Sequence, residues 1–160
     1  MPIILEHMTV VFGFTAAILL VAGPAMIVQG LIGRRTVSRE LAQQRISFPA
    51  GGDLPAWLHG YAGVAVHTGT QARAFSDLIA DHVTKATGGR TYAEIADAWM
   101  AAGRTDERLT RLRETAFMGQ SLRGALLGAY QAWQITLLVI AVGAAFTVMG
   151  VAFLAMALQN

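Results

Sequence analysis

The sequence predicts an all-α integral membrane protein in which two transmembrane helices flank a mainly helical extramembrane domain of about 100 residues. The first observation is the composition, because the 160 residues are 54% hydrophobic and only 14% charged, whereas soluble domains carry about 25% charged residues. The second is where the charges lie. All 12 Lys and Arg residues lie between Arg34 and Arg123, and every acid except Glu6 lies between Glu40 and Glu114. Both ends of the chain are therefore nearly free of charge.

The two uncharged stretches predict the two spans. Residues 8–33 and 135–158 contain no ionisable side chain, and each exceeds the ~20 residues that a helix needs to cross a hydrocarbon core of ~30 Å. The first stretch is longer than the apolar part of a signal peptide, and no basic residue precedes it. We therefore expect transmembrane helices over residues 8–33 and 134–158, with Pro24 kinking the first.

Helical periodicity dominates the predicted domain, residues 34–133. Apolar residues recur every three or four positions after Thr70, which is expected to cap a helix that ends at Gly88. Thr91 and Glu94 have the spacing of a capping box, which predicts a second, shorter helix.

The last helix is expected to begin near residue 106 and to continue into the second span, because no proline follows Asp106. Its first part is expected to pack an apolar stripe on the preceding helices, with Phe117 buried. A Phe117→Ala substitution would then cost about 3–5 kcal/mol. Arg113 borders this stripe, and we expect it to pair with Asp77 or Asp81.

The segment 54–66, LPAWLHGYAGVAV, follows a predicted break in the chain at residues 49–53 and is too short and too rich in glycine to span a membrane. Its aromatic residues fit an interfacial segment that lies on the bilayer or against a partner. A strand or loop in the domain's own core is the other interpretation, and the sequence leaves both open.

Few residues suggest catalysis. The absence of cysteine excludes disulfides, thiolate zinc sites, cysteine nucleophiles and iron–sulfur ligation. The net charge of +2 is too small for a nucleic-acid interface, and spans without ionisable groups do not form an ion path. We therefore expect no catalytic residue, cofactor or metal. The alternative is a metal site built from His59, His67 and His82, although none of these has the i, i+4 spacing of a helical ligand pair.

Small and aromatic residues suggest packing instead. Small residues let transmembrane helices approach closely, and aromatic residues gather at the membrane surface. Gly124 and Gly128 also have the GxxxG spacing at the entrance to the second span. The candidate residues for packing against a partner are Gly23, Pro24, Trp57, Tyr61, Gly124, Gly128, Tyr130, Trp133, Gly143 and Gly150.

Two segments resemble a known group of proteins: residues 69–94, GTQARAFSDLIADHVTKATGGRTYAE, and residues 112–127, LRETAFMGQSLRGALL. They are similar to small actinobacterial two-span membrane proteins of unknown function, which often carry the label "aromatic ring-opening dioxygenase". The resemblance covers residues 39–130 and implies an integral membrane protein, but no activity. The chain departs from the group's pattern because it has no basic residue before the first span. The matching positions are Gln71, Ala72, Ile79, His82, Gly89, Thr91, Tyr92, Ala93, Glu94, Arg113, Thr115, Leu122 and Arg123.

Together these features favour a non-catalytic accessory or stabilising subunit of a larger membrane complex, such as a respiratory or transport assembly. The expected partners are membrane lipids and other transmembrane subunits of a hetero-oligomer, and no nucleic acid. The alternative is a metal-dependent membrane redox enzyme that uses His59, His67 and His82. We expect the protein in the cell membrane. The arginines after the first span favour a cytoplasmic loop by the positive-inside rule, whereas the resembled group implies a loop outside the cytoplasm, which we favour.

Overall fold

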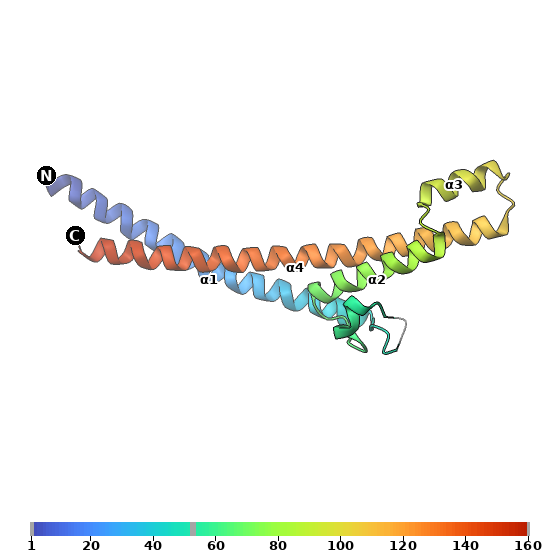
Figure 1. Cartoon of the computed structure of the whole chain (residues 1–160). Helices are drawn as coiled ribbons and strands as arrows, with labels where there is room; N and C mark the ends of the chain where they lie inside the picture. The colour runs from blue at the N-terminus through green and yellow to red at the C-terminus, as the bar shows by residue number, and fades with distance from the viewer. Residues whose placement is uncertain (1, 52–53, 160) are drawn as a thin grey trace. The chain divides into compact units, whose positions relative to one another are not determined.

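The computed structural model describes residues 2–51 and 54–159, with side chains from residue 7 onward, so the predicted break at 49–53 lies partly outside the described residues. Within the described residues the chain forms four α-helices and one short 3-10 helix, η1 (Figure 1). No sheet forms among them, and Ser47 and Ala65 make a single isolated bridge. The all-α class predicted from the sequence is therefore confirmed. The elements are α1 (Pro2–Gln43), η1 (Ala56–Tyr61), α2 (Gly69–Thr87), α3 (Tyr92–Ala101) and α4 (Glu107–Gln159).

The two long helices are α1 and α4. Helix α1 continues through Pro24 without ending, and it extends beyond the stretch 8–33 to Gln43. Helix α4 is unbroken, as the absence of proline predicted. The carboxylate of Asp106 accepts a hydrogen bond from the Leu109 backbone N–H at 3.0 Å, which caps the first turn of α4.

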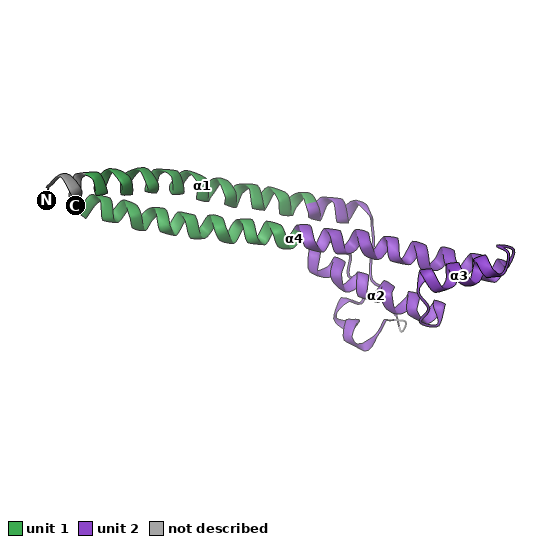
Figure 2. Ribbon diagram, turned by 90° about the horizontal axis from the view of Figure 1, so that it is seen from above, with its two compact units in different colours: residues 1–36, 133–160 green, residues 37–132 purple. Residues whose placement is uncertain are grey.

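The chain divides into two compact units, each described here by itself (Figure 2). Unit 1 consists of Met1–Thr36 and Trp133–Asn160, which contain most of α1 and the second half of α4. Unit 2 consists of Val37–Ala132 and contains η1, α2, α3 and the first half of α4.

Unit 1 is an antiparallel pair of helices. The rings of Phe12 and Phe153 lie 5.7 Å apart. Further along α1, the Arg34 guanidinium lies 4.3 Å from the ring centroid of Trp133. Contacts thus move forward along α1 as they move backward along α4, which Figure 2 shows as two ribbons side by side.

Small residues at seven-residue intervals bring the two helices of unit 1 together. The positions buried on α1 include Ala16, Gly23 and Gly30, and those on α4 include Gly143 and Gly150. A seven-residue interval keeps these positions on one stripe of each helix. A Cβ atom at Gly143 would lie only 2.6 Å from the carbonyl oxygen of Gly23. The close approach of the two backbones therefore depends on glycine at this contact.

Unit 2 has a hydrophobic core of its own, built from the end of α1, the segment around η1, α2 and α4. Phe48 is its aromatic centre, because its ring stacks on Tyr61 at 5.0 Å and meets the edge of Phe75 at 5.1 Å. Such pairs add stability beyond the burial of their area. The buried members of this core are Leu41, Phe48, Leu54, Leu58, Val66, Ala72, Leu78 and Leu126.

Capping boxes begin α2 and α3. At α3 the box predicted from Thr91 and Glu94 is confirmed, since each side chain bonds the backbone N–H of the other residue. At α2 the predicted cap, Thr70, is wrong. Thr68 is the N-cap, because its hydroxyl accepts from the Gln71 backbone N–H and the Gln71 side chain accepts from the Thr68 backbone N–H. The sequence Thr-x-x-Gln is itself a capping box, so the signal was present two residues earlier.

The predicted packing of α4 on α2 is correct in outline and wrong for Phe117 and Arg113. Ala116 and Gly119 are the buried positions, and a Cβ at Gly119 would collide with the side chain of Val83 on α2. These small residues let the helices approach closely, which leaves the Phe117 side chain 62% exposed beside the contact. Arg113 lies over the Trp99 ring, 3.9 Å from its centroid, and does not pair with an α2 carboxylate.

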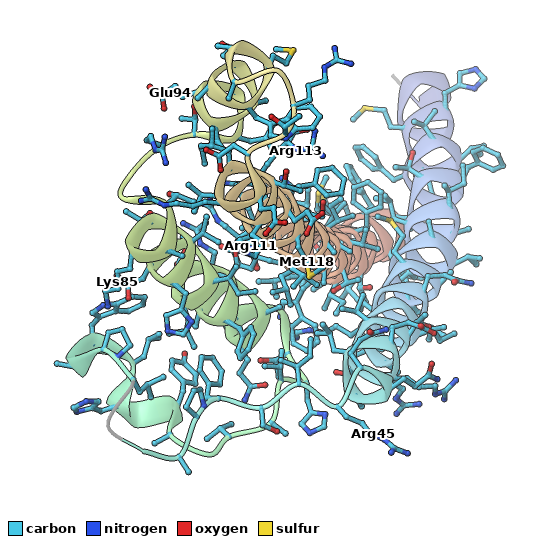
Figure 3. The ribbon with its side chains drawn as sticks, turned by 90° about the vertical axis from the view of Figure 1, so that its right-hand side faces the viewer. Arg45, Lys85, Glu94, Arg111, Arg113 and Met118 are labelled. Atoms are coloured by element: carbon cyan, nitrogen blue, oxygen red, sulfur yellow. The ribbon has the colours of Figure 1, made fainter. Side chains whose placement is uncertain are left out.

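The two carboxylates that were expected to receive Arg113 have partners on their own helix. Asp77 pairs with Arg73 at 3.1 Å, and Asp81 pairs with Lys85 at 2.6 Å. Both are i, i+4 pairs, whose geometry the helix itself supplies. Figure 3 shows Arg113 between α4 and α3.

Candidate functional site

Most of the apolar surface of unit 1 is exposed. Two helices that touch along one stripe leave their other faces uncovered, and only 11% of the most apolar window of each helix is buried. A core helix of a soluble protein is mostly buried instead. By length and composition, His7–Gln43 and Glu107–Gln159 are therefore two helices that could cross a membrane. Their large exposed side chains include Val10, Val11, Phe14, Ile18, Val21, Val28, Leu31, Ile32, Ile135, Leu138, Val148, Val151 and Leu158.

Three of the glycines assigned to a partner lie in the contact between α1 and α4. A Cβ at Gly23 would approach the Gly143 carbonyl oxygen to 2.7 Å, and one at Gly150 would approach the Leu20 side chain to 2.9 Å. The Thr147 hydroxyl donates to the same Gly143 carbonyl oxygen at 2.9 Å. The neighbour that these glycines contact is thus the other long helix of the same chain.

The remaining small candidates face open space. A Cβ at Gly124 or Gly128 would meet nothing within 4 Å, and Pro24 is exposed on α1. Gly124 and Gly128 therefore do not bring α4 close to another helix of this chain. Their role in packing against a partner stays a prediction.

The segment 54–66 contributes to the core of unit 2. Leu54, Leu58 and Val66 are buried there, as the second interpretation of this segment proposed. Tyr61 stacks on Phe48 in the same core. The Trp57 side chain, however, is 61% exposed. An interfacial role for Trp57 stays a prediction.

Tyr130 and Trp133, the two aromatic residues expected at the start of the second span, each lie against an arginine side chain. Arg73 of α2 lies 5.8 Å from the ring centroid of Tyr130, and Arg34 of α1 lies 4.3 Å from that of Trp133. A guanidinium over an aromatic face is attracted by the negative charge of the ring face.

Unit 2 exposes an apolar patch on α4, which we call the α4 patch: Phe117, Met118 and Leu122. Their side chains are 62%, 64% and 49% exposed. The ring of Tyr92, which is also exposed, lies 6.0 Å from that of Phe117. Met118 and Leu122 are one helical turn apart and share a face. These exposed apolar side chains make the α4 patch a candidate interaction surface.

The three histidines of the metal alternative are engaged separately or exposed. His59 Nε2 donates to the Leu54 carbonyl oxygen at 3.1 Å, whereas His67 is exposed and its backbone N–H, not its ring, donates to Gln71 at 2.8 Å. His82 is exposed on α2. Among the described residues, no group of three or more His, Asp or Glu side chains is arranged to hold a metal ion.

Sequence reasoning assigned no contact to Gly30, Arg34, Met118 or Thr147. The seven-residue spacing of Ala16, Gly23 and Gly30 was a detectable signal for the contact stripe. For Arg34 the signal was its position directly after the uncharged stretch 8–33.

Comparisons of this chain with protein-family models, with curated proteins and with solved structures give no match. The resemblance to the small two-span membrane proteins therefore stays a prediction.

Proposed function

We propose that this protein is a non-catalytic accessory subunit that inserts two helices into the membrane and packs against a larger membrane assembly. The observation that carries the proposal is the α4 patch, Phe117, Met118 and Leu122, which is exposed on unit 2. Lipid accounts for exposed apolar side chains within the uncharged stretches. The α4 patch lies between Glu114 and Arg123, outside these stretches, so a protein partner is the better explanation.

Helix α1 adds a second apolar surface. A shallow depression on it is lined by Ala17, Ile18, Val21 and Ala22. Because transmembrane helices associate through close packing of small and branched side chains, this surface suits a neighbouring helix. A respiratory or transport assembly is the class of partner we expect, since such assemblies contain many helices.

Purification of the tagged protein in a mild detergent, followed by mass spectrometry, tests the proposal. We expect the wild type to retain defined membrane subunits. With the triple variant Phe117→Ala, Met118→Ser, Leu122→Ser, the amount of co-purified subunit should fall about tenfold or more. Burying one large apolar side chain contributes about 1.5–3 kcal/mol, and 1.4 kcal/mol is a factor of ten. The matched control is Arg39→Ala with Glu40→Ala, two exposed positions of unit 2 that lie on another helix, α1, and leave the net charge unchanged.

Three outcomes would overturn the proposal. One is a wild-type protein that is stable and monodisperse as a monomer when expressed alone. Another is equal recovery of subunits with the patch variant and with the control. The third is stoichiometric iron or copper that disappears in His82→Ala, which would support the metal-dependent redox enzyme instead.

A further inference from the structure

We propose that Arg34, Arg35 and Trp133 form a binding site for the phosphate of an anionic phospholipid headgroup. All three residues belong to unit 1. The inference rests on the membrane insertion proposed above, and it adds a ligand and a site to that function.

The site lies where both uncharged stretches end. On α1 the stretch 8–33 is followed directly by Arg34 and Arg35, and on α4 Trp133 stands two residues before the stretch 135–158. The Arg34 guanidinium lies 4.3 Å from the Trp133 ring centroid, so the two ends are at the same level of the helix pair. In a membrane this level is the interface, where tryptophan rings and lipid headgroups are found.

Among the residues whose side chains the structure describes, no acidic side chain pairs with Arg34 or Arg35. Residues 7–36 and 133–159 of unit 1 contain no Asp or Glu. The three ion pairs of the described residues are Arg73–Asp77, Lys85–Asp81 and Arg111–Glu107, all outside unit 1. The buried Arg34 Nε has no hydrogen-bond partner among the described residues, and Arg35 is exposed. Two positive charges at the edge of a low-dielectric region are stabilised by a nearby counter-charge.

A lipid phosphate supplies this counter-charge better than other anions. Arginine remains charged at any physiological pH and forms paired hydrogen bonds to phosphate oxygens. The Trp133 ring covers one face of the Arg34 guanidinium, so the donors proposed for the anion are the terminal Nη groups rather than the buried Nε. A headgroup with net negative charge is preferred over a zwitterionic one, since its phosphate is not compensated by an ammonium group. Basic residues between helices at the membrane surface bind such headgroups in other proteins.

The test uses the purified full-length protein in a mild detergent, with phosphatidylglycerol and phosphatidylcholine added in equal amounts. Native mass spectrometry counts the lipid that the protein retains. We expect wild type to prefer phosphatidylglycerol by about thirtyfold, the factor that two interfacial arginines provide. Arg34→Gln with Arg35→Gln should abolish the preference. Arg34→Lys with Arg35→Lys should keep only part of it, because lysine lacks the planar fork of donors.

The matched control is Arg108→Gln with Arg111→Gln, which removes two exposed charges from unit 2 and should leave the preference unchanged. Helix content measured by circular dichroism checks that each variant folds. In a separate competition measurement, inorganic phosphate is added at millimolar concentration, and we expect that it does not displace phosphatidylglycerol.

The inference would be overturned by equal retention of both lipids in wild type, or by an unchanged preference in the double Gln variant. Displacement by inorganic phosphate would assign the site to a free anion instead. Loss of an acidic protein subunit from the double Gln variant, with lipid retention intact, would assign it to a partner protein. Failure of the proposed function is distinguishable, because the wild type would then leave the membrane on alkaline extraction or retain no subunits.

Discussion

At the scale of single residues, the missing side chains of Gly23 and Gly143 decide how closely α1 and α4 approach. Each glycine faces the backbone of the other helix, and a Cβ on either would lie within 2.8 Å of a backbone atom there. Backbone atoms cannot move aside as the end of a flexible side chain can. Any substitution at these positions must therefore separate the helices.

We expect Gly143→Leu to destabilise the helix pair by about 1–3 kcal/mol, the usual cost of overpacking. The chain has no cysteine, so a disulfide between Leu19→Cys and Gly150→Cys reports the contact. A Cβ at Gly150 would lie 3.1 Å from Leu19 Cβ, so the disulfide forms after the two helices move apart by about half an ångström, to the usual Cβ–Cβ separation of about 3.5–4.5 Å. The yield of the intramolecular disulfide should fall several-fold in the Gly143→Leu background.

Gly13→Leu is the control, because a Cβ at Gly13 meets nothing within 4 Å. Equal disulfide yields in the Gly143→Leu and Gly13→Leu backgrounds would show that the glycine contact does not hold the pair together.

The capping box of α3 makes one residue sensitive to pH. The Thr91 backbone N–H donates to the Glu94 carboxylate at 2.7 Å and the Thr91 hydroxyl donates to it at 2.9 Å. These hydrogen bonds, the backbone one first, lower the pKa of Glu94 below its ordinary value of 4.5. The ionised Glu94 carboxylate therefore stabilises the first turn of α3.

A group whose pKa is lower in the folded state contributes stability that is present above its unfolded pKa and lost as the pH falls through the folded pKa. We therefore expect the amides at the start of α3 to lose hydrogen-exchange protection as the pH falls below 4.5, after correction for the intrinsic exchange rate. Glu94→Gln, which does not titrate, should show no such change. The same pH dependence in wild type and Glu94→Gln would contradict this explanation.

At the scale of elements, Trp99 attaches α3 to α4. Its indole N–H donates to the Thr110 hydroxyl at 2.9 Å, and the Arg113 guanidinium covers its ring. Both partners are on the first turns of α4, so a single side chain joins two helices that follow each other in the chain.

We expect Arg113→Gln to weaken this attachment by about 1 kcal/mol, because it removes the cation over the ring. Hydrogen exchange of residues 92–101 measures the effect, and exchange there should become several-fold faster. Arg108→Gln is the control, since Arg108 is exposed on the same helix. If both variants exchange at the same rate, the contact of Arg113 with Trp99 does not stabilise α3.

At the scale of the whole molecule, the two units differ in how many charged residues they contain. Within residues 7–36 and 133–159, Arg34 and Arg35 are the only Asp, Glu, Lys or Arg residues, whereas unit 2 carries charges of both signs along its helices. The cost of moving ions out of water favours lipid around the uncharged helices and water around the charged ones, which agrees with two helices that could cross a membrane.

We predict that the protein stays in the membrane pellet after alkaline carbonate extraction. The side on which unit 2 lies can then be read from a single cysteine, Arg108→Cys, in the cysteine-free chain. A membrane-impermeant maleimide should label it in intact cells if the loop lies outside the cytoplasm, as we favour. Labelling only after the cells are permeabilised would place the loop in the cytoplasm. Release by carbonate would contradict the membrane assignment itself.

The all-α class, the two long apolar helices and the unbroken α4 followed from the sequence alone. These features depend on local properties: hydropathy over about 20 residues, the absence of proline, and the reach of a capping side chain over three residues. Each is a relation between neighbours in the chain, which a sequence displays directly. The wrong N-cap, Thr70, was also an error in reading a local pattern, because Thr68 and Gln71 have the three-residue spacing of a capping box.

Only the tertiary structure decided which residues face each other. Phe117 is more hydrophobic than Ala116 and Gly119, yet the two smaller residues are buried, and Gly119 lies against Val83 of α2. Arg113 was expected to meet a carboxylate and instead lies on Trp99, while Arg34 reaches Trp133 across about a hundred residues of chain. The physical reason is that a helix presents several possible faces of similar hydrophobicity. The face that is buried depends on how closely two backbones can approach, which is a property of both helices together.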